Sequence, residues 1–245
     1  MLTTLGGLEV RVMQQTQGPA RAAVILCHGF GAPADDLVTL WNELVSREPS
    51  LADVRFFFPA GVLSMGNLGW GQARAWWLID LPTVARLQAG DPSSLREFRR
   101  VEPDGMPAAR QAVRALVSEV CLKSDLPVGR VIVGGFSQGA MIATDVALRL
   151  EEAPLGLVVL SGTLLLEDVW ATKAKARAGL PVFQSHGRGD PILAFGAAQW
   201  LRELFEAQGM PVTFNPFDGG HTIDESTVTG LGRYLVQRLE TLSAR

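Results

Sequence analysis

The chain has 245 residues, of which 47% are hydrophobic and 19% are charged, which is typical of one globular domain spanning residues 1–245. Its formal net charge of −3 comes from 22 basic and 25 acidic residues spread along the sequence, so the basic patch that nucleic-acid binding requires is not expected. Cys27 and Cys121 are the only cysteines, which excludes a disulfide framework and leaves a single bridge as the alternative to two free thiols. We interpret both as core thiols.

The first residues, MLTTLGGLEVRVMQQ, lack the basic start and the apolar stretch of a secretory signal. No apolar run approaches the roughly 18–20 residues that are needed to cross a bilayer. We therefore expect a cytoplasmic protein without a membrane span.

Short apolar runs of β type alternate with longer amphipathic stretches, which predicts an α/β fold with a mostly parallel central sheet and helices on both faces. The runs AAVILC, VIVGG and LVVL are almost continuously apolar, as expected for strands covered on both faces. In chain order we predict strands at Leu8–Met13 and Ala22–Cys27, a helix at Asp35–Arg47, a strand at Val54–Phe58, a helix at Pro107–Lys123, a strand at Val131–Val133, a helix at Gln138–Leu150, strands at Gly156–Leu160 and Pro181–Gln184, a helix at Ala194–Ala207, a strand at Pro211–Asn215 and a helix at Ser226–Thr241.

One connection, Pro59–Gly105, is much longer than the others. Within it only a short helix is predicted, near Ser94–Arg100, and long connections in compact domains are usually functional. By contrast, Ser161–Leu180 is too short for a folded lid, so no large lid domain is expected.

The segment VIVGGFSQGAMIATDVAL predicts a strand, a sharp turn and a helix, with a Gly-x-Ser-x-Gly match, Gly135 to Gly139, at the turn. Such a turn exposes the serine hydroxyl, and its glycines avoid a collision that larger side chains would cause. The helix start directs backbone N–H groups and its positive dipole end at a developing anion. Because the match falls between a strand and a helix rather than at random, we predict that Ser137 is a catalytic nucleophile.

A nucleophilic serine needs a histidine as its base, and the chain has three. In folds with this turn the chain order is serine, acid, histidine. His221 follows the last predicted strand, at the carboxyl end of the sheet, where α/β sites assemble. We predict His221 as the base, whereas His28 and His186 each precede a glycine after a strand, which favours structural hydrogen bonding.

The acid that orients the base is predicted to be Asp190, in SHGRGDP, between Ser137 and His221. Aspartate before proline is also a common helix N-cap, and both roles are compatible only if the side chain turns toward His221. Two rival acids follow the preceding strand: Glu167 and Asp168. Two other acids lie too close to His221 in sequence and are interpreted as turn or cap residues: Asp218 and Asp224.

The oxyanion is expected to be bound by two backbone N–H groups. One is that of Gln138, and the other is that of Phe30, in the run His28-Gly29-Phe30-Gly31, where glycines let the backbone approach a ligand closely. The alternative is a glycine-rich connection without a catalytic role.

The motifs HGFG, ARAWWLID, GFSQGA, HGRGDP and GGHT, in this order, resemble the phospholipase/carboxylesterase family, which includes bacterial carboxylesterases and acyl-protein thioesterases. The resemblance runs from about Ala22 to Leu239. It implies the α/β-hydrolase fold, a triad of Ser137, Asp190 and His221, and oxyanion donors at Phe30 and Gln138. It also implies hydrolysis of carboxylic esters or thioesters without a cofactor.

We therefore predict a serine hydrolase that cleaves small-molecule acyl esters through an acyl-enzyme. The same residues would serve a thioesterase or a lysophospholipase, and a non-catalytic binding protein stays open because the fold permits such reuse. Metal catalysis is not expected, since the three histidines show no His-x-x-x-His spacing. The oligomeric state is left open.

Substrate contacts are expected from the long connection, because it leaves its strand at the same end of the sheet as Ser137 and His221. We predict that its tryptophans form one wall of an acyl groove: Trp70, Trp76 and Trp77. The alternative is that they form a satellite core under the loop. Arg74 could contact a substrate carboxylate or pair with an acidic residue.

Overall fold

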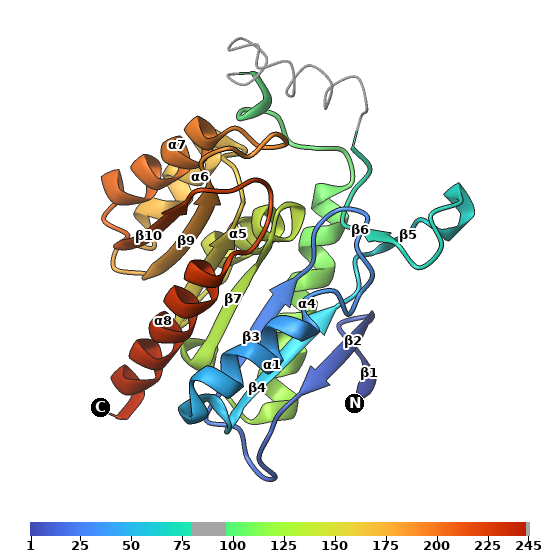
Figure 1. Cartoon of the computed structure of the whole chain (residues 1–245), viewed down its shortest axis with the longest axis vertical. Coiled ribbons are helices and arrows are strands. Elements are labelled where there is room, and N and C mark those ends of the chain that lie inside the picture. Colours follow the sequence, from blue (N-terminus) through green and yellow to red (C-terminus); the bar gives the residue numbers. More distant parts are fainter. Residues whose placement is uncertain (80–96, 244–245) are drawn as a thin grey trace.

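The computed structural model describes residues 1–79 and 97–243. At its centre lies an eight-stranded sheet with the order β1-β2-β4-β3-β7-β8-β9-β10 (Figure 1). Its strands are β1 (Leu2–Leu5), β2 (Leu8–Met13), β3 (Ala22–Cys27), β4 (Val54–Pro59), β7 (Val131–Phe136), β8 (Gly156–Leu160), β9 (Val182–Gly187) and β10 (Val212–Phe217).

The sheet is mostly parallel, as predicted. The strands β3, β4, β7, β8, β9 and β10 run in one direction, whereas β2 is antiparallel to β4 and β1 to β2. All residues of β3, β8 and β9 are buried, because helices cover both faces of the sheet.

Helices lie on both faces (Figure 1). One face is covered by α1 (Val38–Arg47) and α8 (Glu225–Ser243), whose Leu44 and Leu235 share a core cluster with Phe56 of β4. The other is covered by α4 (Met106–Ser124), α5 (Gln138–Arg149), α6 (Glu167–Lys175) and α7 (Phe195–Ala207), whose apolar residues pack in a second cluster. Short 3-10 turns are η1 (Pro49–Leu51), η2 (Gly66–Leu68) and η3 (Val128–Arg130).

Most predicted elements are found with ends shifted by one to three residues. The helix predicted at Asp35–Arg47 begins at Val38, because the residues before it form a turn in which the Val38 N–H donates to the Asp35 carbonyl, 3.0 Å away. The strand predicted at Val131–Val133 continues to Phe136, since β3 and β8 hydrogen-bond to it on both sides. The helix α6 and the strand β1 were not predicted.

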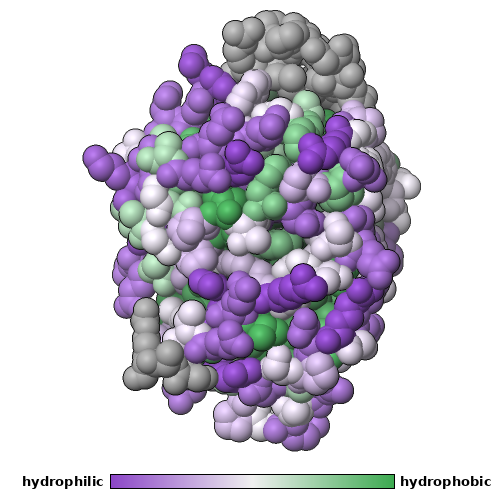
Figure 2. All heavy atoms as spheres, turned by 60° about the vertical axis from the view of Figure 1, so that its left-hand side comes forward, coloured by the Kyte–Doolittle hydropathy of each residue, from purple (hydrophilic) through white to green (hydrophobic). Residues whose placement is uncertain are grey.

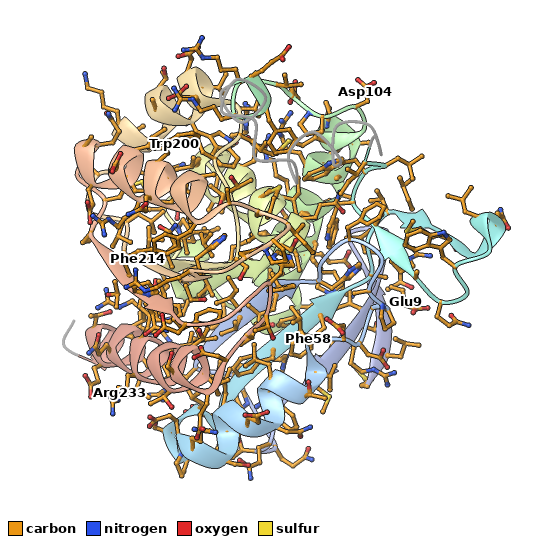
Figure 3. The ribbon with its side chains drawn as sticks, turned by 45° about the horizontal axis from the view of Figure 1, so that its top comes forward. Glu9, Phe58, Asp104, Trp200, Phe214 and Arg233 are labelled. Atoms are coloured by element: carbon orange, nitrogen blue, oxygen red, sulfur yellow. The ribbon has the colours of Figure 1, made fainter. Side chains whose placement is uncertain are left out.

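The long connection forms a small hairpin of β5 (Leu63–Ser64) and β6 (Arg74–Ala75), which projects from the body of the molecule (Figures 1 and 3). Of the short helix predicted near Ser94–Arg100, residues 97–98 are helical and the part before them lies outside the described residues. No lid domain is present in the described part of the chain.

The face drawn in Figure 2 is largely hydrophilic, with hydrophobic side chains in small areas among polar ones. Among residues 1–79 and 97–243, no helix has the length and apolar character to span a membrane.

Candidate active site

Ser137 occupies the turn between β7 and α5, with a positive φ of 54° that is rare for a residue with a side chain. The turn is as tight as its sequence predicts. A Cβ atom added to Gly139 would lie 2.0 Å from the Cys27 carbonyl oxygen, and one added to Gly135 would lie 2.5 Å from the same atom. Only glycine fits at these two positions, so the strained turn is built into the sequence.

The imidazole of His221 lies beside the serine. Its Nε2 atom is 2.8 Å from Ser137 Oγ, and its ring packs against Phe136, with ring centroids 4.8 Å apart. Thr222 directly follows His221 in the chain, and its carbonyl oxygen accepts a hydrogen bond from the buried Ser161 hydroxyl, 3.3 Å away. The loop that carries the imidazole is therefore held against the ends of β7 and β8.

Asp190 completes a chain of hydrogen bonds. Its Oδ2 atom lies 2.7 Å from His221 Nδ1, and its Oδ1 atom accepts the N–H groups of Ile192 at 2.8 Å and Leu193 at 2.9 Å. Burial alone would raise the pKa of Asp190, but hydrogen bonds from His186, His221 and the Leu193 N–H outweigh it and hold that pKa well below its usual range. The side chain thus faces His221 as a carboxylate.

The acid loop and the histidine loop are joined through their backbones. Arg188 N–H donates to the Phe217 carbonyl at 2.8 Å, and Gly189 N–H donates to the Gly219 carbonyl at 2.9 Å. A Cβ atom on Gly187 would lie 2.2 Å from the Gly220 oxygen, so only glycine permits this approach. The two loops form one rigid unit that sets the distance between Asp190 and His221.

The rival acids have other partners. Glu167 pairs with Arg99 at 2.8 Å and with Arg100 at 3.4 Å, and Asp168 is exposed at the start of α6. As interpreted from the sequence, Asp224 caps α8 by accepting the Thr227 N–H at 2.8 Å. Asp218 is exposed and lies 3.5 Å from Arg188. None of these four carboxylates is hydrogen-bonded to His221 in the described structure.

The two expected oxyanion donors lie on the two segments next to the serine. Neither the Phe30 nor the Gln138 backbone N–H donates to another group among the described residues. A Cβ atom on Gly29 would lie 3.5 Å from the Ser137 Cβ, so this loop runs directly against the nucleophilic turn. The backbone of Arg74 in β6 binds the loop that carries Phe30. Its carbonyl accepts the Gly31 N–H at 2.9 Å, and its N–H donates to the Ala32 carbonyl at 3.0 Å.

His28 has the structural role that was favoured for it. Its Nε2 atom accepts the Gly61 N–H at 2.9 Å, so its proton lies on Nδ1 and is donated to the Gly29 carbonyl at 2.7 Å. Burial, helped by the nearby charge of Arg74, lowers the pKa of His28 and keeps the ring neutral.

The Gln138 side chain links the nucleophilic turn to the segment that carries Trp76 and Trp77. This link was not predicted from the sequence. The Gln138 Oε1 atom accepts the Trp76 N–H and its Nε2 group donates to the Trp77 carbonyl, each at 2.9 Å. This contact was not detectable, because a glutamine at this position shows no partner in sequence.

The four residues expected to bind substrate fall into different environments. Trp76 is fully buried, Trp77 is 3% exposed, and both belong to the main core. This corrects the expectation that they line an open groove, because they present almost no surface. Trp70 is 54% exposed, edge-on to Phe30 with centroids 6.0 Å apart. Arg74 donates from Nε to the Gly61 carbonyl at 2.9 Å, and it makes no ion pair within the described residues.

A shallow hollow, open in part to solvent and with room for about one water molecule, lies beside the acid loop. It is lined mostly by apolar side chains, with one guanidinium: Phe98, Arg99, Thr163, Leu164, Ile192, Leu193, Ala194 and Ala197. The Arg99 charge is committed elsewhere, because it pairs with Glu167 and lies over the ring of Trp200, which is labelled in Figure 3. The lining of the hollow is therefore mostly apolar, but the hollow is too small to enclose a substrate chain.

Cys27 is buried at the end of β3, where burial raises the pKa of its thiol, and Cys121 is half-buried on α4. Both are free thiols. Among residues 1–79 and 97–243, no group of three or more His, Cys, Asp or Glu side chains is placed to hold a metal ion.

The parallel sheet with its serine at a strained strand–helix turn is the architecture of an α/β-hydrolase. The chain belongs to the phospholipase/carboxylesterase family, whose sequence profile matches residues 8–237. It is 26% identical to the acyl-protein thioesterase 1 of Debaryomyces hansenii over 217 residues, which cover 86% of this chain and 88% of that protein. It is 29% identical to the protein of the same name from Eremothecium gossypii over 200 residues, covering 81% and 78%.

Solved structures agree on the fold. The crystal structure of esterase PE8 superposes with a TM-score of 0.78 at 24% identity, covering 94% of this chain and 98% of that one. A carboxylesterase from Mesorhizobium loti superposes with a TM-score of 0.71 at 17% identity, covering 96% and 97%. The family and the curated relatives, rather than these structures, show that the chain is an enzyme of the esterase and thioesterase type.

Proposed function

We propose that this protein hydrolyses carboxylic esters through an acyl-enzyme on Ser137, with His221 as base and Asp190 as the acid that orients it. The observation that carries the proposal is the continuous chain of hydrogen bonds, 2.8 Å from Ser137 Oγ to His221 Nε2 and 2.7 Å from His221 Nδ1 to Asp190 Oδ2. Two contacts of this length orient the imidazole with Nδ1 toward the carboxylate and Nε2 toward the hydroxyl, as a general base requires.

In the first step Ser137 Oγ attacks the substrate carbonyl while its proton passes to His221 Nε2. The carbonyl oxygen becomes an anion, which the N–H groups of Phe30 and Gln138 stabilise. His221 then donates the proton to the leaving alcohol as the tetrahedral intermediate collapses. Water repeats the sequence on the acyl-enzyme, His221 again taking and returning the proton, and releases the carboxylic acid.

We further propose that the acyl group lies along the exposed face of Trp70. Trp70 packs edge-on against Phe30, which carries one of the proposed oxyanion donors, and it offers exposed apolar surface there. Trp76 and Trp77 do not contact the acyl group in this proposal. Their backbone groups bind the Gln138 side chain and so hold their segment against the nucleophilic turn.

A second candidate activity, thioester hydrolysis, is favoured by the relatives that are named acyl-protein thioesterases. The same acyl-enzyme would form with a thiol as the leaving group. A non-catalytic role is disfavoured because Ser137, Asp190 and His221 are all retained. One sheet that takes strands from both ends of the chain supports a single domain over residues 1–245.

The test is kcat/KM on esters and thioesters of the same acyl groups for the wild type, Ser137→Ala and Ser118→Ala. Ser118 is an exposed serine on α4, so its variant controls for loss of a hydroxyl alone. We expect Ser137→Ala to lose about 10⁴-fold or more and Ser118→Ala to lose nothing. A folded Ser137→Ala variant that keeps more than about a tenth of the activity would disprove the proposal, and the ratio between substrates decides the preference.

A further inference from the structure

His186 is a second histidine beside Asp190. It is the fifth residue of β9, and its side chain has no exposed surface. Its Nε2 atom is 2.8 Å from the Leu193 carbonyl oxygen and 3.2 Å from Asp190 Oδ2, the same oxygen that faces His221. One oxygen of the carboxylate therefore lies close to both imidazoles.

The protonation of His186 follows from its partners. Both atoms near Nε2 are acceptors, so the proton lies on this nitrogen, which donates to the Leu193 carbonyl and has Asp190 Oδ2 3.2 Å away. Its Nδ1 atom is buried and has no partner among the described residues. A proton there would be a buried donor without an acceptor, which favours the same tautomer.

The contacts of His186, Leu193 and Asp190 form a closed ring. His186 donates to the Leu193 carbonyl, and the Leu193 N–H donates to Asp190 Oδ1 at 2.9 Å. His186 also reaches Asp190 Oδ2 directly. One ring thus restrains both the loop after Asp190 and the rotation of its carboxylate. The imidazole also packs against Phe195 of α7, with ring centroids 6.2 Å apart, so α7 restrains the ring as well.

We propose that His186 is a positioning residue, whose Nε2–H group orients the Asp190 carboxylate toward His221. The inference rests on the proposed role of Asp190 and adds a fourth side chain to the three that carry the chemistry. His186 touches neither substrate nor reacting atoms and acts only through Asp190.

A double-mutant cycle tests this role. We expect His186→Leu to lower kcat/KM about tenfold, since partners that orient a catalytic ligand are commonly worth on the order of 10–100-fold. His186→Gln, which returns an N–H donor near the position of Nε2, should stay within about threefold of wild type. In the Asp190→Asn background His186→Leu should cause no further loss, because the group through which it acts is gone.

Gln184→Leu is the matched control. Gln184 is buried in the same strand and donates to the Ala198 carbonyl at 2.8 Å, without contact to Asp190. Its variant should change stability and leave kcat/KM per folded molecule unaltered. If His186→Leu does not fold, His186→Asn replaces it, because the shorter amide cannot reach Asp190.

Two results would overturn the inference: an equal loss from the His186 variant in both backgrounds, or a folded His186→Leu variant within about twofold of wild type. Failure of the proposed function would look different, since Asp190→Asn alone would then retain its activity.

Discussion

The Nδ1 atom of His221 lies 2.7 Å from Oδ2 of Asp190, although the two residues are 31 positions apart. The backbone bonds between their loops, from Arg188 to Phe217 and from Gly189 to Gly219, fix this distance before any substrate arrives. Such preorganisation lets the carboxylate stabilise the imidazolium without rearrangement during the reaction.

Asp190→Asn should therefore lower kcat on the order of 10²–10⁴-fold, because the amide neither stabilises the cation nor enforces the tautomer. Asp168→Asn, at an exposed position on α6, is the control for loss of one negative charge. Steady-state kinetics on one ester suffices. An Asn variant within about threefold of wild type would transfer the role to another acid, and Glu167→Gln would then be measured next.

The depressed pKa of Asp190 also predicts how stability changes with pH. A carboxyl whose pKa is lower in the folded state stabilises that state above its unfolded pKa of about 3.9. This contribution is lost as the pH falls through the folded value. In urea unfolding, the wild type should lose stability relative to Asp190→Asn on acidification below about pH 4. A difference that stays constant from pH 7 to pH 3 would contradict the account.

The glycines of the nucleophilic turn should not tolerate alanine. Gly139→Ala places a methyl group 2.0 Å from the Cys27 carbonyl, which should cost about 1–3 kcal/mol or more in the free energy of unfolding. Gly129→Ala, in η3, is the control, since its added methyl group meets nothing within 4 Å. That variant should be unchanged or more stable by up to about 1 kcal/mol. Equal effects on the two thermal midpoints would be inconsistent with this packing.

Trp70 and Trp76 should respond differently to alanine. Trp70→Ala should flatten the dependence of kcat/KM on acyl length while sparing acetyl esters, because each buried methylene is worth about 0.8 kcal/mol, roughly fourfold. Trp76→Ala should instead cost about 3–5 kcal/mol of stability and lower activity on every ester alike. A panel of esters of graded acyl length, with thermal denaturation in parallel, separates the two. An unaltered acyl-length slope for Trp70→Ala would remove Trp70 from the proposed groove.

Local patterns predicted much of this fold. The strands β3 and β8 and the Gly-x-Ser-x-Gly turn are each determined by the residues that form them, so their positions were evident from sequence. The helix α6 was missed because it is short and buries only Trp170 and Ala174, which leaves no clear amphipathic period. The strands β5 and β6, of two residues each, are too short for any period to register.

What the sequence could not supply is long-range contact. A tryptophan is equally suited to a core and to a groove, and only the pairing of Gln138 with the backbone of Trp76 and Trp77 places these residues inside. Likewise, Glu167 forms ion pairs with Arg99 and Arg100, which are distant from it in the sequence. These pairs occupy its carboxylate, so that Asp190 and not Glu167 is the acid that faces His221. The histidine beside Asp190 was visible in HGRGDP, but its approach to the carboxylate depends on how the loop folds back on β9.

The central claim, that Ser137 is the nucleophile, is tested most directly by labelling the intact protein with a fluorophosphonate and locating the adduct by peptide mass spectrometry. The account predicts one adduct, on Ser137, that is absent from Ser137→Ala and unaffected in Ser118→Ala. An adduct on another residue, or undiminished labelling of a folded Ser137→Ala variant, would contradict it.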